Sequence, residues 1–571
     1  MAFLWQGPQT RFRVGRYVSR FVAVRGRGRF LALTFLCIGV YGWCLNPLHG
    51  LAEAPAALPA VQPPAATALA APNHARAREM TAQIDQALAE AWLAAGIEPT
   101  IASDDAEFMR RIYLDLAGKI PSVAQSREFL SDTGANKRER LVDQLLASAI
   151  CASHFANTWR DTLLLGTNPE LRVSLPELES WLRLRFTANT PYNQLVAELV
   201  SSSSALPTRR GQPLAGTIPS PIAFFQANER KPESIAASLS SVFLGVQVEC
   251  AQCHDHPFAK WKQEDFWSLA AFFRGLDGPT ADNMMMVSLS DSFDRGGLKI
   301  PGTEMVALPK FLDGSVPTWR AEIGNRTALA QWMTHPQNPF FARAAVNRVW
   351  EQFFGKSLSA PADSVEAPDP RRAQLVEQLA EQFVATRFDL KQLMRGIALS
   401  RAYQLSSKVP TTDTDLTAQF ACMPVRRMTA DQLFDSLVQA TGFYEAPPPR
   451  NAQPFQADSV RVDFRNKFAA EGRQRSENQT TIVQALTLMN GKLVGDATSV
   501  DRSKTLTAIR KIPFVDAKDR VDMLFLATLC RMPHDDETAE FLAYVKAGDQ
   551  DGRLADVLWV LLNSAEFVSN H

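Results

Sequence analysis

The chain has 571 residues with 60 basic and 60 acidic side chains, so its formal net charge is zero. Seven of the basic residues, all arginines, lie within the first 29 positions, where no acidic residue occurs, and the rest of the chain is therefore net acidic. A net acidic chain without a basic patch interleaved with aromatic residues excludes nucleic acid as an expected partner. Seven cysteines spread over this length exclude a disulfide scaffold.

The first predicted element is a targeting segment. The Arg-rich residues 1–29 lead directly into the uncharged, apolar stretch from Phe30 to Leu45, which is the pattern of an export signal. Sixteen residues are long for a signal peptide and short for a membrane span. We therefore expect residues 1–52 to be either a cleaved signal peptide or a retained N-terminal anchor in the inner membrane. Both alternatives export the remaining chain to the periplasm or cell envelope.

Beyond residue 52 the pattern predicts a linker and two helical domains. Residues 53–75 are rich in Ala and Pro and hold few large apolar side chains, which is typical of an extended linker. Residues 76–275 and 323–571 show repeated helical periodicity, whereas residues 276–322 between them alternate and predict a small β insertion. The expected fold class is mainly α, with two helical domains and a β-rich insertion between them.

Three helical features in the first domain are specific enough to test. A helix is predicted over residues 137–146, where apolar side chains recur at helical spacing: Leu141, Val142, Leu145 and Leu146. Ser103 or Asp104 is the expected N-cap of the helix that carries Phe108. A helix rich in small residues is expected to run from Ser234 to about Val248 and to lead directly into Cys250.

The most informative motif is Cys250-Ala251-Gln252-Cys253-His254, the C-x-x-C-H pattern of covalent haem c attachment. Each thiol can add to one vinyl group of the haem, and two intervening residues let one helical turn present both sulfurs to the same edge of the macrocycle. His254 then follows where its ring can ligate the iron. Export agrees with this prediction, because c-type haem is attached on the outer side of the bacterial inner membrane.

The same segment allows two other interpretations. Together with His256, the motif offers up to four ligands for a zinc or iron ion: Cys250, Cys253, His254 and His256. The two histidines would point to opposite sides of an extended backbone but could share a small ion in a turn, so His256 favours a metal ion over a second haem ligand. Asp255 could orient one of the rings. In the third interpretation the thiols form a disulfide clip with a structural role.

A bound haem would need a sixth ligand and an apolar wall. The candidate ligands are Met284, Met285, Met286, Met305, His154 and His256. The candidate wall is a run of aromatic side chains after the motif: Phe258, Trp261, Phe266, Trp267, Phe272 and Phe273. The competing interpretation is that residues 266–273 form a buried helix and that the methionines fill a core or a loop.

Several longer phrases resemble one known family. In the first domain they are Phe108–Pro121, Lys137–Ser148, His154–Asp161 and Val242–Phe258, and in the second domain Asn347–Gly355, Phe388–Lys391, Ser400–Ser406, Gln484–Asn490 and Leu561–Phe567. They are similar to a bacterial family, abundant in planctomycetes, built from two paired domains of unknown function, numbered fifteen-forty-nine and fifteen-fifty-three. The first of these is described as planctomycete cytochrome-like. Many members carry an additional N-terminal cytochrome c domain, which this sequence does not show.

The resemblance implies less about function than about family. No reaction is established for the domain pair, and members are often encoded beside an exported sulfatase-like protein, which suggests such a protein as a partner. One departure is visible, because relatives usually follow the Asn347 phrase with a loop containing Ser-His-Pro. This chain has Pro368-Asp-Pro-Arg-Arg-Ala373 there, so no role of that histidine is carried over.

The leading hypothesis is an exported protein with one covalent haem c on Cys250 and Cys253, ligated by His254, which acts in electron transfer or as the redox part of an envelope assembly. The alternatives are a metal-dependent enzyme built on the Cys/His set and a non-enzymatic binding protein of the cell envelope. Whether the protein is an enzyme stays open, because the sequence contains no G-x-S-x-G, phosphate loop or H-E-x-x-H motif.

Overall fold

The computed structural model describes residues 74–164, 174–203, 208–209, 212–213, 219–276, 289–360, 369–408, 414–443, 460–468 and 482–571. The predicted signal peptide or anchor, nearly all of the predicted linker, and Met284 to Met286 lie outside these residues. The first described helix begins at Ala75. No helix among the described residues is both long and apolar enough to span a membrane.

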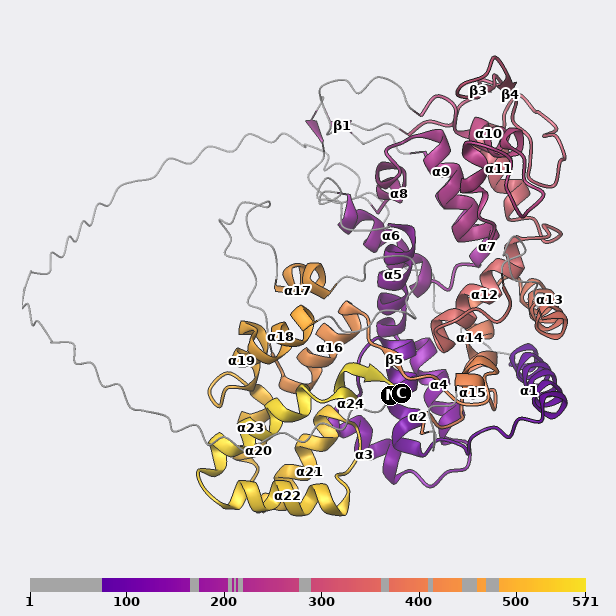
Figure 1. The fold of residues 1–571 in the computed structure, drawn as a ribbon. Helices are drawn as coiled ribbons and strands as arrows, with labels where there is room; N and C mark the ends of the chain where they lie inside the picture. The colour runs from indigo at the N-terminus through magenta and orange to yellow at the C-terminus, as the bar shows by residue number, and fades with distance from the viewer. Residues whose placement is uncertain are drawn as a thin grey trace, which may run out of the picture. The chain divides into compact units, whose positions relative to one another are not determined.

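Helices make up most of the described chain (Figure 1). The first are α1 (Ala75–Ala95), α2 (Asp105–Ala117), α3 (Val123–Ser131), α4 (Lys137–Ala147), α5 (Ala149–Leu163), α6 (Leu175–Thr187), α7 (Tyr192–Val200), α8 (Ile222–Ala227), α9 (Pro232–Leu239) and α10 (Gln263–Ala270). Then follow α11 (Asn325–Met333), α12 (Phe341–Phe354), α13 (Pro370–Ala385), α14 (Leu390–Ala398), α15 (Thr414–Ala418), α16 (Ala430–Thr441), α17 (Val460–Phe468) and α18 (Ile482–Asn490). The last are α19 (Lys492–Thr498), α20 (Lys504–Lys511), α21 (Ala517–Thr528), α22 (Asp535–Lys546), α23 (Gln550–Leu562) and α24 (Ala565–Val568). The predicted mainly α class is confirmed.

The described strands are two residues long and form antiparallel pairs. They are β1 (Thr208–Arg209) with β2 (Gln212–Pro213), β3 (Leu298–Lys299) with β4 (Val306–Ala307), and β5 (Arg426–Arg427) with β6 (Ser569–Asn570). The β3–β4 hairpin lies within the predicted β insertion, and Gly297 is needed beside it because a Cβ there would lie 2.4 Å from the carbonyl oxygen of Ala307. The β5–β6 pair joins residues more than a hundred positions apart, which no sequence periodicity signals.

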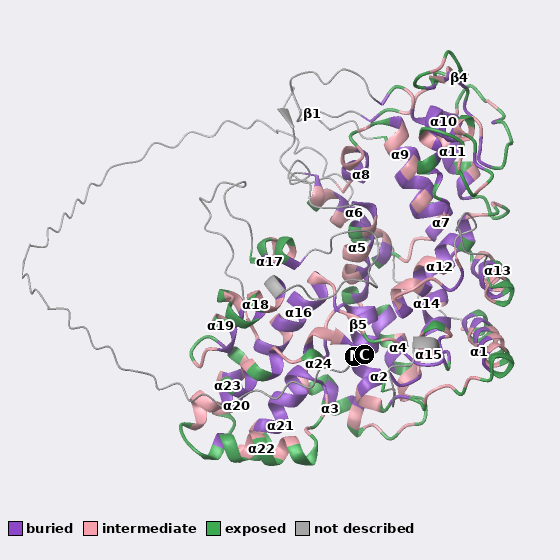
Figure 2. Cartoon of the chain, viewed as in Figure 1, coloured by how far each residue is buried: buried purple, intermediate pink, exposed green. Residues whose placement is uncertain are grey.

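The helices form where caps and apolar stripes coincide. The Asp104 carboxylate accepts a hydrogen bond from the Glu107 backbone N–H and caps α2, as the sequence predicts. The predicted stripe of α4 is confirmed, because its four apolar side chains are the buried residues of that helix. Burial is continuous along α2 from Glu107 to Ala117, whereas only Val545 is buried in α22 (Figure 2). Helix α2 therefore lies in the core, and α22 lies at the surface.

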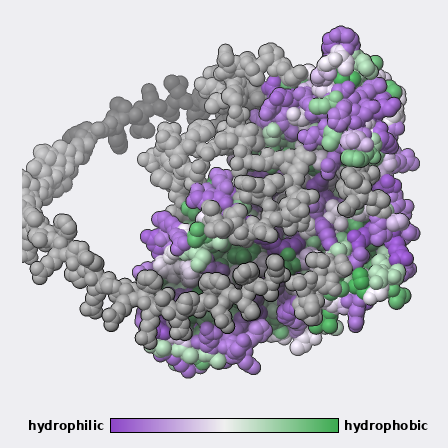
Figure 3. All heavy atoms as spheres, viewed as in Figure 1, coloured by the Kyte–Doolittle hydropathy of each residue, from purple (hydrophilic) through white to green (hydrophobic). Residues whose placement is uncertain are grey.

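The two predicted helical domains contact each other extensively. Helix α1 packs against α13 and α14, and α12 packs against the segment that leads to the C-x-x-C-H motif (Figure 1). All of these helices belong to one compact unit, Ala70–His571. The predicted boundaries at residues 275 and 323 between the two domains stay predictions. On the face drawn in Figure 3, hydrophilic residues cover much of the described surface.

Two adjacent arginines fasten α2 to distant parts of the chain. Arg110 is fully buried and donates to four backbone carbonyl oxygens, those of Thr528 (2.9 Å), Phe567 (2.7 Å), Glu566 (3.1 Å) and Ser569 (3.3 Å). Arg111 is also fully buried. Its donors bind the carbonyl oxygens of Tyr403, Leu405 and His571, and the carboxylate of Glu107 at 2.6 Å. The pair therefore ties α2 to residues 403–405, 528 and 566–571.

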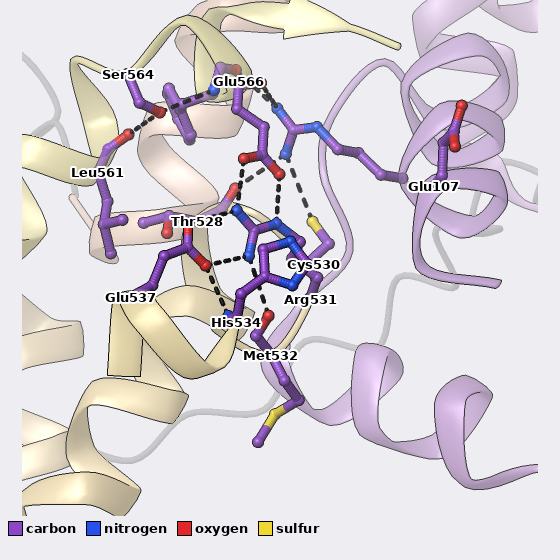
Figure 4. Close-up of polar contacts among 12 residues, drawn as sticks. Glu107, Thr528, Cys530, Arg531, Met532, His534, Glu537, Leu561, Ser564 and Glu566 are labelled. Atoms are coloured by element: carbon purple, nitrogen blue, oxygen red, sulfur yellow. Dashed lines mark hydrogen bonds and ion pairs between the residues drawn. The ribbon is translucent and has the colours of Figure 1, made fainter. Parts of the chain in front are cut away.

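A third arginine, Arg531, forms ion pairs in the same region. Arg531 binds Glu537 and Glu566 at 2.7 Å each (Figure 4). Its guanidinium holds the pKa of Glu537 at about 2. Because the Glu566 backbone carbonyl also accepts from Arg110, this ion-pair network and the Arg110 contacts share one residue.

The partly buried ring of His571 gives the fold a specific pH dependence. Burial, with Arg110 and Arg111 nearby, lowers the pKa of His571 to about 4, against the opposing charges of Glu566 and Glu107. The unfolded chain therefore binds one more proton than the folded chain between about pH 6.5 and 4, so stability falls as the pH drops through that window.

We expect the urea midpoint of the protein to fall across this window, and the fall to be smaller in His571→Gln. Urea titrations at several pH values, followed by circular dichroism, measure it. His335→Gln, at an exposed histidine, is the control and should keep the wild-type slope. Equal slopes for His571→Gln and the wild type would contradict the prediction.

Candidate functional site

The helix that precedes the C-x-x-C-H motif is shorter than the sequence predicts. Helix α9 ends at Leu239 and continues as one turn of π-helix, η2 (Ser240–Leu244). Gly245 then adopts a left-handed conformation with φ of 66°, which ends the helix. The prediction of one helix from Ser234 to about Val248 is therefore wrong, because the glycine stops it before the motif.

The motif itself begins on a separate 3-10 helix, η3 (Val248–Gln252). In a 3-10 helix, residues three apart share a face. Val248 and Ala251 are buried and form the inner face, whereas Cys250, and Cys253 directly after the last residue of η3, are both exposed. Both thiols are free in this structure. The disulfide clip is thus not formed here, and both sulfurs belong to exposed residues.

His254 is held in the tautomer that a metal-ligating histidine needs. Its Nδ1 lies 2.8 Å from the carbonyl oxygen of Asp255. Because a carbonyl oxygen only accepts, Nδ1 carries the proton, and the lone pair of the neutral ring is on Nε2. An Nδ1–H bonded to a backbone carbonyl is also the contact that orients many ligating histidines. Asp255 therefore orients the His254 ring, as expected, but through its backbone carbonyl oxygen.

His256 is held in the opposite tautomer. Its Nδ1 accepts from the backbone N–H groups of Phe258 (3.2 Å) and Ala259 (3.0 Å), so in the neutral ring the proton is on Nε2. No group of three or more His, Cys, Asp and Glu side chains within the described ranges is arranged to hold a metal ion. The four predicted metal ligands are not brought together here, and the metal interpretation stays a prediction.

The start of α10 fixes the loop that carries the motif. The Gln263 side chain donates to the carbonyl oxygens of Gln252 (3.2 Å) and Cys253 (3.0 Å), and Trp267 Nε1 donates to Gln252 at 3.0 Å. The Gln263 backbone N–H donates to the Asp255 carboxylate at 2.9 Å. These bonds satisfy the carbonyl groups at the end of η3, so the backbone of the motif has a defined conformation without a bound group.

The aromatic run after the motif belongs to the protein core. Five of its six members are buried, namely Trp261, Phe266, Trp267, Phe272 and Phe273. The alternative of a buried helix over residues 266–273 is confirmed by α10 and the 3-10 helix η4 (Ala271–Phe273). Only Phe258 is exposed, at 73%, and remains available to cover a bound group.

The predicted sixth ligands other than His256 lie on other segments of the chain or outside the described residues. Met305 is exposed between the paired strands β3 and β4, and Met284 to Met286 are among the residues that the structure does not describe. His154, on α5, lines a cavity to which no residue of the motif contributes. The structure therefore adds no support for a particular sixth ligand.

That cavity was not foreseen from the sequence. Its volume is about 590 Å³, and its lining includes Asp115, Lys356, Arg426, Arg427 and Asn570. Asp115 and Lys356 lie in or directly after phrases that carry the family resemblance, which is the one signal the sequence gives. No motif spacing relates these residues, because they come from four separate parts of the chain.

Comparison with known proteins identifies the class of chain. Residues 83–277 match the PSCyt2 domain, a protein of unknown function (DUF1549), and residues 325–461 match the PSD1 domain, a protein of unknown function (DUF1553). The chain belongs to the family that pairs these two domains. The C-x-x-C-H motif lies inside the PSCyt2 match. Searches of curated proteins and of solved structures found no match.

Proposed function

We propose that the chain is an exported protein that carries one covalently attached haem c and transfers electrons in the periplasm or cell envelope. Cys250 and Cys253 would hold the haem, and His254 would ligate its iron. The observation that carries the proposal is the state of the motif: both thiols are free and exposed, and His254 Nδ1 bonds the Asp255 carbonyl oxygen, so that Nε2 carries the lone pair of the neutral ring. When bound, the haem would supply one-electron redox chemistry.

The residues around the motif have defined tasks in this proposal. The Asp255 carbonyl oxygen orients the His254 ring, and Gln263 and Trp267 hold the carbonyl groups of the attachment turn. Because the motif is exposed and the neighbouring aromatic rings are buried, a group attached there would be accessible to a protein partner. The export signal predicted at residues 1–52 supports the location, and an exported sulfatase-like protein is the partner that the family resemblance suggests.

The hydrogen bonds of His254 and His256 support the metal-dependent alternative less well than the haem proposal. Ligation by His256 through Nε2 would require the proton to move to Nδ1, where two backbone N–H groups already donate. His254 meets no such obstacle. This difference favours the haem pattern, which uses His254 alone, over the four-ligand set.

The test is to produce the full chain in a bacterial host with haem c maturation machinery. We expect a Soret band that survives acid-acetone extraction and disappears in the Cys250→Ser/Cys253→Ser variant. His254→Ala should alter the absorption spectrum, whereas the matched His256→Ala should leave it unchanged. Absence of the band together with one equivalent of metal by elemental analysis would overturn the proposal in favour of a metal site. Absence of both would favour the structural clip.

A further inference from the structure

The cavity described above is built by both family domains. Asp115 of α2 and His154 of α5 come from the PSCyt2 match, and Glu351 of α12, Lys356 and Arg427 from the PSD1 match. Asn570 of β6 completes the lining from beyond both matches. A volume of about 590 Å³ lies within the range of cavities that bind small organic molecules.

One ion pair in the lining is already complete. Arg426 donates to both carboxylate oxygens of Asp115, at 2.8 and 3.0 Å. Asp115 also accepts from the hydroxyl of Tyr403 and from the side-chain amide of Asn570, at 2.8 Å each. The charges of Asp115 and Arg426 therefore balance each other and leave no surplus for a ligand.

Two other cations in the lining have no anionic partner. Within the described part of the chain, Lys356 and Arg427 make no ion pair and no side-chain hydrogen bond, and Lys356 contacts only the ring face of Phe420, at 5.2 Å. Burial and the nearby Arg372 lower the pKa of Lys356 to about 8, and burial lowers the pKa of Arg427. Partly desolvated cations without a counterion are unfavourable, and a bound anion would remove that cost.

Hydrogen-bond acceptors without donors line the same cavity. The side-chain oxygens of Gln352 (Oε1) and Asn570 (Oδ1) are buried and have no partner. The Glu351 carboxylate likewise has no hydrogen bond or ion pair to a described residue. Buried acceptors are normally satisfied, so the Gln352 and Asn570 oxygens call for donors such as hydroxyl groups, and the partly buried Glu351 carboxylate can accept from them too. The lining thus combines unpaired cations with unpaired acceptors.

We infer that this cavity binds a small hydroxylated organic anion of the sugar-acid class. Lys356 and Arg427 bind its carboxylate, and Glu351, Gln352 and Asn570 accept hydrogen bonds from its hydroxyl groups. The site is independent of the C-x-x-C-H motif, because no residue of the motif lines it. Both family domains contribute side chains to its lining, so the proposed binding site requires the two domains together.

Isothermal titration of the full chain with D-glucuronate, D-glucose and sodium sulfate tests the inference. We expect saturable binding of glucuronate, no measurable binding of glucose, and binding by sulfate at least tenfold weaker than glucuronate, because sulfate offers no hydroxyl donors to the acceptors. Binding of glucose as tight as glucuronate would overturn the role of the cations. Sulfate binding as tight as glucuronate would overturn the role of the acceptors.

Variants separate this site from general charge attraction. Lys356→Met and Arg427→Met should each weaken glucuronate binding by about tenfold or more, since each removes a charged hydrogen-bond donor. Lys546→Met and Arg127→Met, at exposed side chains outside the cavity lining, are the matched controls and should bind like the wild type. Unchanged affinity in both cavity variants would overturn the inference.

The protonation of Lys356 can be tested on the wild-type protein, without any substitution. The ammonium group is charged below its pKa, so glucuronate affinity should fall as the pH rises through about 8. Near that pH, binding should take up protons, which titrations in buffers of different ionisation enthalpy detect. Arg372 and Cys422 are the charged or titratable groups that act on Lys356. A wild-type affinity that stays flat from pH 7 to 9, with no proton uptake, would contradict the assignment of Lys356.

Discussion

Replacing Arg110 with Met is expected to lower the free energy of unfolding by about 3 to 5 kcal/mol. Methionine fills a similar volume, but it leaves the carbonyl oxygens of Thr528, Glu566 and Phe567 buried without their donor. Each buried unsatisfied acceptor costs about 1 to 3 kcal/mol, and the relief from no longer burying a charge offsets only part of the sum. The loss should be concentrated where α2 meets the end of the chain.

Urea denaturation followed by circular dichroism measures the change, and limited proteolysis should show earlier cleavage near residues 528–571. Arg127→Met, on the exposed face of α3, is the matched control and should shift the midpoint little. If Arg110→Met and Arg127→Met unfolded at the same urea concentration, the four carbonyl contacts would not stabilise the fold as argued.

Local signals predicted much of the helical structure. The stripe of α4 and the Asp104 cap of α2 are both found, because each depends on neighbours within one or two turns. The helix expected to end at about Val248 failed for an equally local reason, since Gly245 interrupts an apolar pattern that otherwise continues. The periodicity of apolar residues predicts the buried face of the helix, but it does not predict the left-handed conformation of Gly245.

The candidate sites divide along the same line. The C-x-x-C-H residues are adjacent in sequence, so the motif could be found directly as a candidate site, although the burial of the following aromatic run could not be foreseen. The cavity is assembled from segments up to several hundred residues apart, and a lone Lys356 or Arg427 reads as an ordinary surface cation. Only the three-dimensional contacts show that the Asp115 carboxylate in this cavity is already paired with Arg426.

Replacing Asp115 with Asn is expected to lower the free energy of unfolding by about 3 kcal/mol, although the two side chains have the same shape. The carboxylate accepts from Arg426, Tyr403 and Asn570, and an amide NH₂ in place of one oxygen would face these donors. Tyr403 is fully buried, so its hydroxyl has no water to replace the lost acceptor.

The same substitution also frees the charge of Arg426 inside the cavity. In Asp115→Asn, glucuronate should therefore raise the urea midpoint by more than it does in the wild type, because a third cation becomes available to the anion. Asp501→Asn, at an exposed carboxylate, is the control and should change neither the midpoint nor the response to glucuronate. Wild-type stability in Asp115→Asn would mean that Arg426 does not depend on this carboxylate. A destabilised variant that responds to glucuronate no more than the wild type would separate the structural role of Asp115 from anion binding.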